Sequence, residues 1–382
     1  MKAMCGWAKG RGRTLLSLVG LVLLGVAASR LAVAGEGVVA PAPASGPLVI
    51  QNQSHQVYTG LTITSGSGQD CIQVTNSTDI TIENSEIGPC GGNGVNINGG
   101  SKIQIYDSYI HPETKSPGCC DHNDGVLVEN PAEVTIQGNV IAYGESNVEA
   151  PQGVTGLTVI GNFLLNPRGP YPRGQNVQAW NATNAVVKNN YTLSSRDTQK
   201  YLYPDDQEDS INFGIGSGFV ARGNYVTGGQ SPSGCGIIAD DEANSAQFTG
   251  NKLVDTGACG IGVASGTKQL VNHNRIINRD PVPGGGNSAL YVWSQYSGVG
   301  CGPVTVSNDV ATEIRNDGTQ SGYWDGGGCD PVTLEGNVWN EAAEKRLTPV
   351  DAKLPPPLIP PQPRRCVISS PYSTQTKWPA CQ

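Results

Sequence analysis

Two segments in the middle of the chain combine basic residues with tyrosines. One contains Tyr171 and Arg173, and the other contains Lys200 and ends at Asp209. Tyrosine is a common proton donor, and an amine or guanidinium can act as a base where desolvation lowers its pKa. Elimination beside a sugar carboxylate also requires that the carboxylate be neutralised. The sequence therefore predicts β-elimination on an acidic polysaccharide, with the catalytic residues Tyr171, Arg173, Lys200, Asp209 and Asn212.

A row of polar and aromatic residues occupies alternate positions of successive apolar strands. Alternation directs these positions out of the fold, where amides and carboxylates can bind sugar hydroxyls and rings can stack on sugar faces. An insertion over residues 111–124 adds a histidine and an aspartate beside this row. The predicted substrate-binding residues are Gln178, Trp180, Glu149, His122, Asp124, Asp240, Tyr291 and Trp293.

The scaffold that must position these residues is a repeat. A short apolar strand followed by Asn in a tight bend recurs at intervals of 23 to 34 residues. A constant minimum with a variable excess is typical of a solenoid whose coils are interrupted by loops. Asn tolerates the left-handed backbone of such bends, and stacked amides can hydrogen-bond between coils. We expect a structural role for the bend residues, which include Asn84, Asp107, Asn139, Asn308 and Asn337.

A second strand in each coil also alternates. Its inner positions are apolar throughout, from Ile72 and Val74 to Leu290 and Val292. Two strand columns with apolar inner faces predict an all-β, single-domain right-handed parallel β-helix, and crossover connections favour that hand. We expect a solenoid of about ten coils over residues 47–345.

The two ends of the chain differ from the repeats. Basic residues, the apolar run Leu15 to Ala28 and a small-residue cleavage site predict a signal peptide over residues 1–34. Residues 346–382 form a Pro-rich tail that Cys366 and Cys381 could pin by a disulfide.

Cysteine usage agrees with export. Removal of Cys5 with the signal peptide leaves ten of the eleven cysteines, which predicts disulfides and a secreted or periplasmic location. Cys235 and Cys259 precede the same inner position in adjacent coils and are candidates to bridge them. Cys90 is a candidate to pair with Cys119 or Cys120.

The net charge is −8, and loss of the five basic residues in the signal peptide brings it to −13. Such a chain is not expected to bind nucleic acid. We expect a monomer that acts on an acidic polysaccharide, with no membrane segment in the mature form. The predicted chemistry requires no cofactor, but Ca²⁺ could bind two acidic runs. These runs are Asp205-Asp206-Gln-Glu208-Asp209 and Asp240-Asp241-Glu242.

Four segments carry a more specific signal. They are Gly169-Pro-Tyr-Pro-Arg-Gly-Gln-Asn-Val-Gln178, Glu208-Asp-Ser-Ile-Asn212, Ala289-Leu-Tyr-Val-Trp-Ser-Gln295 and Tyr323-Trp-Asp-Gly-Gly. Over roughly residues 47–345, the chain resembles the exported β-helix uronate lyases of polysaccharide lyase family 31. The resemblance implies cleavage of alginate or glucuronan by a Tyr and a Lys, and roles for Tyr171, Arg173, Gln178, Asp209 and Asn212.

The chain departs from that family at one point. Where the relatives carry Tyr-Lys shortly after the Ile-Asn pair, this chain has Gly214-Ile215. Either Lys200 replaces the family lysine, or the protein binds without cleaving.

Three other functions are consistent with the sequence. A β-helix glycoside hydrolase would need paired carboxylates, for which Asp209 with Asp240 or Asp241 is a candidate. A uronan epimerase would share the elimination half-reaction. A noncatalytic carbohydrate-binding or surface β-helix would need only the outward row.

Overall fold

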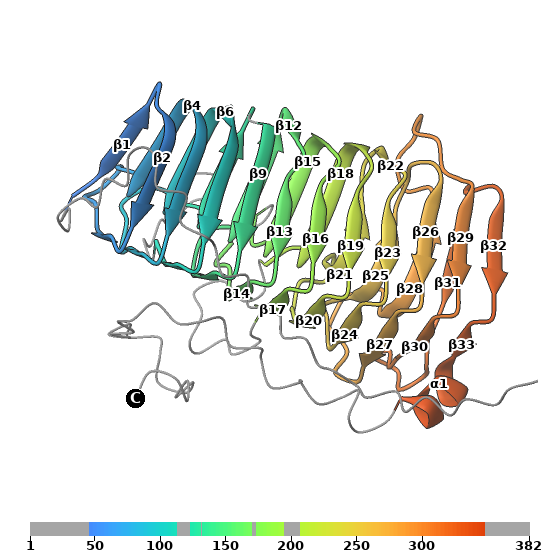
Figure 1. Cartoon of the computed structure of the whole chain (residues 1–382). Helices are drawn as coiled ribbons and strands as arrows, with labels where there is room; N and C mark the ends of the chain where they lie inside the picture. The colour runs from blue at the N-terminus through green and yellow to red at the C-terminus, as the bar shows by residue number, and fades with distance from the viewer. Residues whose placement is uncertain (1–45, 113–122, 131, 170–172, 195–206, 348–382) are drawn as a thin grey trace, which may run out of the picture. The chain divides into compact units, whose positions relative to one another are not determined.

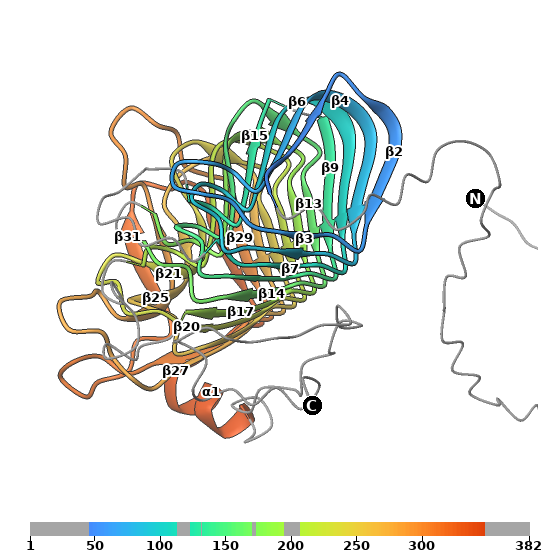
Figure 2. The same ribbon diagram turned by 90° about the vertical axis from the view of Figure 1, so that its left-hand side faces the viewer.

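The computed structural model describes residues 46–112, 123–130, 132–169, 173–194 and 207–347. They form a parallel β-helix, whose stacked coils are visible from the side in Figure 1 and end-on in Figure 2. All the strand pairs in its two sheets are parallel. The 11-stranded sheet takes one strand from each coil, so the described residues make eleven coils, close to the ten expected. This result confirms the predicted fold class.

The strands occupy three positions around each coil, where the sequence predicted two. The strands stack in three columns, of which columns one and two are joined through long strands into the 22-stranded sheet. Column one contains β1 (Leu48–Gln51), β4 (Ile72–Glu83), β6 (Val95–Tyr106), β8 (Val126–Glu129), β11 (Val148–Gln152), β15 (Val177–Thr183), β18 (Ile211–Ser217), β21 (Cys235–Ala239), β25 (Cys259–Val263), β28 (Ser288–Trp293) and β31 (Trp324–Gly327).

Column two shares β4 and β6 with column one. Its other strands are β2 (Ser54–Thr59), β9 (Ala132–Gln137), β12 (Val154–Thr155), β13 (Thr158–Ile160), β16 (Val186–Lys188), β19 (Val220–Arg222), β22 (Ala243–Asn244), β23 (Gln247–Thr249), β26 (Gln269–Asn272), β29 (Val304–Ser307) and β32 (Val332–Glu335).

Column three is the 11-stranded sheet, made of the short strands that follow the bends. It contains β3 (Thr62–Ile63), β5 (Glu86–Ile87), β7 (Tyr109–Ile110), β10 (Val140–Ala142), β14 (Phe163–Leu165), β17 (Tyr191–Ser194), β20 (Tyr225–Gly228), β24 (Lys252–Val254), β27 (Arg275–Asn278), β30 (Val310–Glu313) and β33 (Val338–Trp339). The one helix among the described residues, α1 (Asn340–Arg346), follows β33.

The interior register of column one is the one that the sequence predicted. Ile72 pairs with Val95, and the same row continues through Val126, Val148 and Val177. It extends to Ile211, Ile237, Ile261 and Leu290, and every member is fully buried. Because the side-chain period is two, this register also fixes which residues point outward.

The bend residues form a hydrogen-bonded ladder between coils. Asn162 Oδ1 accepts from the backbone N–H and the Nδ2 of Asn139 at 2.9 and 3.1 Å, and the later rungs repeat this pattern as far as Asp309. Its members are Ser85, Ser108, Asn139, Asn162, Asn190, Asn224, Asn251, Asn274, Asp309 and Asn337. The structural role that we expected is therefore confirmed.

The ladder corrects two details of the prediction. The left-handed backbone belongs to the residue before each rung, such as Gly138 at φ 71°, and not to the ladder Asn. Asn84, Asp107 and Asn308 occupy that preceding position, with φ of 50°, 45° and 58°, so they are not rungs. A left-handed residue turns the chain, and the next side chain then points into the stack.

Three disulfides link described cysteines: Cys71–Cys90, Cys235–Cys259 and Cys301–Cys329. The predicted bridge between Cys235 and Cys259 is confirmed. The pairing predicted for Cys90 is wrong, because its partner is Cys71. Among the described residues, no helix is long and apolar enough to span a membrane.

Candidate functional site

The outward row of column one is mostly covered. Glu149, Gln178 and Asn212 pair in register on β11, β15 and β18, as predicted. Their side chains point out of the solenoid, yet all three residues are buried, with 1%, 6% and 2% exposed. The expectation of an open polar row is therefore wrong here, because Arg173 contacts Glu149 and Gln178, and Asp209 and Asp240 contact Asn212. Arg173 comes from an insertion between β14 and β15.

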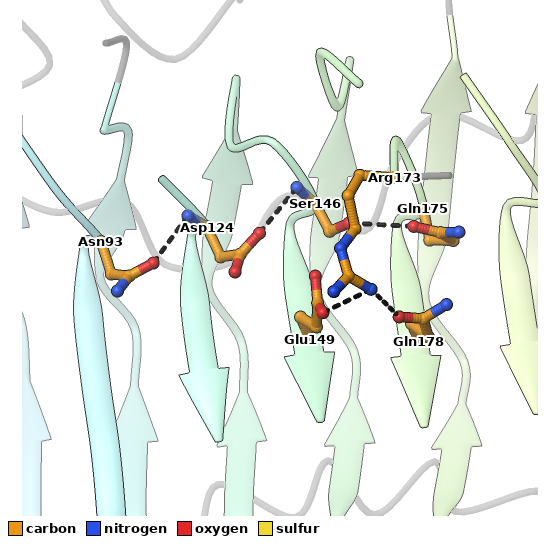
Figure 3. Close-up of polar contacts among 7 residues, drawn as sticks. All are labelled: Asn93, Asp124, Ser146, Glu149, Arg173, Gln175 and Gln178. Carbon is orange, nitrogen blue, oxygen red and sulfur yellow. Dashed lines mark hydrogen bonds and ion pairs between the residues drawn. The ribbon is translucent and has the colours of Figure 1, made fainter. Parts of the chain in front are cut away.

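Arg173 links two of these residues, as Figure 3 shows. Its Nη1 lies 2.7 Å from Glu149 Oε1 and donates to Gln178 Oε1 at 2.8 Å. The backbone carbonyl of Arg173 also accepts from the N–H of Glu208 at 3.3 Å. The Arg173 side chain therefore joins two coils and is already engaged by protein groups.

A second ladder runs just before the column-one strands begin, above Glu149 in the view of Figure 3. The N–H of Asp124 donates to Asn93 Oδ1 at 2.8 Å, and Asp124 Oδ1 accepts from the N–H of Ser146 at 2.9 Å. Ser146 Oγ then donates to Gln175 Oε1 at 3.0 Å. Asp124 is only 1% exposed. This position corrects the expectation that Asp124 lies open to substrate, since its carboxyl group is part of the coil-to-coil ladder.

A cleft of about 430 Å³ opens next to this cluster on column one. Its described lining combines a positively charged group, amides, aromatic rings and three carboxyl groups. The lining residues are Pro151, Arg173, Gln175, Gln178, Trp180, Glu208, Asp209, Asn212, Asp240 and Tyr296.

Asn212 links two carboxyl groups on the acidic side of the cleft. Its Nδ2 donates to Asp209 Oδ2 at 2.8 Å and to Asp240 Oδ2 at 3.2 Å, so these two oxygens lie at most 6.0 Å apart. Asp209 Oδ1 also accepts from the N–H of Cys235 at 2.6 Å. The hydroxyl of Tyr296 donates to Asp240 Oδ1. Asn212 Oδ1 is buried and has no hydrogen-bond partner within the described part of the chain.

The third carboxyl group, Glu208, is half-buried and accepts from Ser233 Oγ at 3.1 Å. Burial is the main reason that the pKa of Glu208 rises to about 7, and the charge of Asp240 adds to the shift. Burial, followed by the charges of Glu208 and Asp240, also raises the pKa of Asp209 well above its usual value. Protons are therefore held in this cluster near neutral pH.

The cluster around Arg173 is similar. Burial raises the pKa of Glu149 to about 7, although Arg173 opposes that shift. Burial and the charge of Glu149 raise the pKa of Asp124 as well. Because the Arg173 guanidinium interacts with the buried carboxyls of Glu149 and Asp124, its charge is already balanced by protein groups and is not available to neutralise a substrate carboxylate.

Six of the predicted site residues line the cleft together: Arg173, Gln178, Trp180, Asp209, Asn212 and Asp240. Glu149 lies beneath Arg173, and Tyr291 and Trp293 lie on β28, toward the C-terminal end of column one. Tyr171, Lys200 and His122 lie outside the described residues. Sequence reasoning placed Glu208 in an acidic run and in a segment shared with the lyase family but gave it no catalytic role. It missed Tyr296, which belongs to a loop after β28 with no repeat signal.

Among the described residues, no group of three or more His, Cys, Asp or Glu is arranged to hold a metal ion. Two of the predicted calcium ligands, Asp205 and Asp206, fall outside that part of the chain.

Comparison with known proteins agrees with the geometry. The family described as "Right handed beta helix region" matches residues 48–149. No curated protein matches the sequence.

Solved structures resemble the fold at low sequence identity. DFA-IIIase from Arthrobacter chlorophenolicus A6 in complex with GF2 is 12% identical with a TM-score of 0.56, covering 78% of this chain and 83% of that one. A mutant of that protein in complex with DFA-III is 11% identical with a TM-score of 0.51, covering 78% and 85%. PfbA, a surface adhesin of Streptococcus pneumoniae, is 10% identical with a TM-score of 0.41, covering 78% and 70%.

At these identities the similarity concerns the fold alone. Together with the parallel columns and the buried inner rows, the family match over residues 48–149 and the similarity to DFA-IIIase identify the fold as a right-handed parallel β-helix.

Proposed function

We propose that the protein is a glycoside hydrolase that cleaves a neutral polysaccharide in the column-one cleft. The observation that carries this proposal is the group of three carboxyls in one cleft, Glu208, Asp209 and Asp240, of which the last two accept from the Asn212 amide. Glycosidic hydrolysis needs a protonated carboxyl for the leaving oxygen and an ionised one for the sugar or the attacking water. Glu208 and Asp240 are the candidates for these two roles.

Glu208 is the proposed general acid. With a pKa of about 7 it keeps its proton at neutral or mildly acidic pH, and it is half-buried at the cleft wall. Asp240 is the proposed nucleophile or base, because it lines the cleft and its two oxygens accept hydrogen bonds from the Tyr296 hydroxyl and Asn212 Nδ2, which hold the carboxylate in place.

Asp209 and Asn212 have supporting roles in this proposal. Asp209 is nearly inaccessible, and its two oxygens hold the N–H of Cys235 and the amide of Asn212. Asn212 Oδ1 lacks a protein partner, and a sugar hydroxyl could satisfy it. Trp180, half-exposed at the cleft, offers a ring for stacking on a sugar face.

Uronate lyase activity, the function implied by the family resemblance, is less well supported. An anionic substrate would face three acidic side chains in this cleft, and the described guanidinium there is engaged by Glu149 and Gln178. The proposed lyase pair of Tyr171 and Lys200 lies outside the described residues. β-Elimination is therefore the second outcome for the assay to detect.

Export, a monomeric state and the absence of a nucleic-acid or membrane partner remain proposals. The described disulfides support an oxidising compartment. The proposed acid–base chemistry uses no metal ion, so treatment with EDTA is expected to leave activity unchanged; loss of activity would favour the Ca²⁺ alternative.

The decisive experiment is a screen of the full chain on neutral and uronate polysaccharides. New reducing ends without unsaturated-uronate absorbance indicate a hydrolase, and new absorbance indicates a lyase. Glu208→Gln and Asp240→Asn should each lower hydrolysis by about 100-fold or more. Asp241→Asn, next to Asp240 but outside the described cleft lining, is the matched control. A hydrolase activity that survives both cleft substitutions would rule out this site.

A further inference from the structure

Three outward aromatic side chains of column one each pack over a glycine of the neighbouring strand, in space that a larger residue would fill. A Cβ added at Gly214 would lie 2.2 Å from Cε3 of Trp180. A Cβ at Gly262 would lie 2.8 Å from the ring of Tyr291. These glycines have no positive φ, so the missing side chain makes room for the ring and does not serve a turn.

The third ring, that of Trp293, packs over Gly326 in the same way. A Cβ at Gly326 would lie 2.4 Å from Cγ of Trp293. Each ring therefore lies close against the backbone of the adjacent strand. This packing holds the ring in place and directs one side of it away from the sheet.

The supporting glycines recur at even intervals along the solenoid axis but are staggered across it, because Gly262 is in register with Asn212, two residues before Gly214. Gly214 is on β18, Gly262 on β25 and Gly326 on β31, and one strand, β21 or β28, separates each successive pair. Two strand spacings amount to roughly 9.6 Å. This length is close to the disaccharide repeat of an extended, two-fold glycan such as a β-1,4-linked chain, in which every second sugar presents the same face.

The far end of this row is exposed. Trp293 is 36% exposed and Trp324 is 42% exposed, and their rings meet edge to face with centroids 5.7 Å apart. The Tyr291 and Trp324 centroids are 6.2 Å apart, and Tyr291 and Tyr296 pack on one hydrophobic cluster. Because Tyr296 lines the cleft, the aromatic surface continues from the cleft to Trp324.

The charges along this path are negative. Asp240 lies at the cleft, and Asp325 lies exposed beside Trp324. Among the described residues of the column-one strands from β18 to β31, there is no Lys or Arg. A neutral glycan suits such a surface better than an acidic one.

We propose that Tyr291, Trp293 and Trp324 extend the cleft into a groove that binds an extended neutral glycan along the helix axis. This inference deepens the proposed function, because it names the conformation of the chain that enters the same site. The rings over Gly214 and Gly326 are separated by four strand spacings, roughly 19 Å. Oligosaccharides of several units are therefore needed to reach both.

The test measures binding separately from cleavage. Asp240→Asn is used as the parent, and calorimetric titration compares cellohexaose and mannohexaose, which are extended, with maltohexaose, which coils. Trp293→Ala and Trp324→Ala are each expected to weaken binding of an extended hexaose by roughly threefold to tenfold. Trp293→Tyr keeps a ring and should retain most of the affinity. Leu334→Ala is the control, since Leu334 is 46% exposed on β32 of the same coil but lies in column two.

Equal affinity of the parent and both alanine variants would overturn the inference, and so would equal binding of maltohexaose or no binding of any hexaose. Tryptophan-dependent binding of an extended hexaose would support it even if the wild-type protein cleaves none of the glycans. In that case the hydrolase proposal would fail while the groove stands.

Discussion

Asp309 is the one acidic residue in an otherwise neutral ladder, and its replacement by asparagine is expected to stabilise the protein. Asp309 Oδ1 accepts from the N–H and Nδ2 of Asn274 at 2.6 and 2.9 Å. Oδ2 is buried without a hydrogen-bond partner, and the residue is fully buried. Burial is the cause that raises its pKa from 3.8 to about 7.

An asparagine at 309 would have donors that the aspartate lacks. Asn274 Nδ2 donates to the carbonyl of Phe248, and Asn337 Nδ2 donates to the carbonyl of Val306. The equivalent carbonyl for position 309 is that of Val271, which pairs with both Phe248 and Val306. The amide of Asp309→Asn could therefore donate there and to Asn337 Oδ1, as the other rungs do.

The magnitude follows from the pKa. An acid whose folded pKa is raised loses stability as pH increases from its unfolded pKa, 3.8, through its folded pKa, about 7. The penalty at pH 8 is roughly 4 kcal/mol, and at pH 5 it is about 2 kcal/mol. The gain from Asp309→Asn should therefore be larger at pH 8 than at pH 5, with about 1 kcal/mol more for each new hydrogen bond.

Urea denaturation of the wild type and Asp309→Asn from pH 5 to 8 measures this difference. Asn251→Asp, which places an acid on another rung, is the mirror control and should lose stability increasingly as pH rises. A gain that is the same at pH 5 and pH 8, or a loss at pH 8, would refute the argument that buried charge destabilises this rung.

Three further predictions concern the cleft. Glu208 must be protonated to act as the general acid, and its pKa is about 7, so the rate of hydrolysis should fall as the pH rises above about 7. A pH–rate profile that is flat through that range would contradict this role of Glu208. Arg173→Ala leaves the buried carboxyl of Glu149 without its ion-pair partner and should lower the free energy of unfolding by about 3 kcal/mol. Adding Glu149→Gln to this variant should recover part of that loss. Urea denaturation of the single and double variants measures both effects, and a double variant no more stable than Arg173→Ala would argue against the ion pair. Gly214→Ala should displace the Trp180 ring and lower the free energy of unfolding by about 1–3 kcal/mol. Gly286→Ala is the control, because a Cβ there meets no atom within 4 Å. Unchanged stability and tryptophan fluorescence in Gly214→Ala would show that the Trp180 ring does not need the space above Gly214.

Much of the fold is encoded in local patterns. Alternation of apolar residues determines which side chains face inward, so the register from Ile72 to Leu290 could be predicted without a structure. The bridge between Cys235 and Cys259 followed from the same register. The exact ladder positions could not be predicted from the pattern alone, because Asn or Asp can occupy either the ladder position or the left-handed position before it, as Asn84, Asp107 and Asn308 do.

The site itself depended on tertiary structure. The repeat brought Gln178 and Asn212 into adjacent coils, but it held no information on how insertions cover them. Arg173 meets Glu149, and Tyr296 meets Asp240 from 56 residues away, because loops return to the same face of the stack. The sequence by itself determined the β-helix and the face of column one that carries the polar row, since both depend on a period of two. Only the tertiary structure decided which of those residues are buried, which carboxyls keep a proton and which line a cleft, because desolvation and charge coupling depend on neighbours that no local pattern specifies.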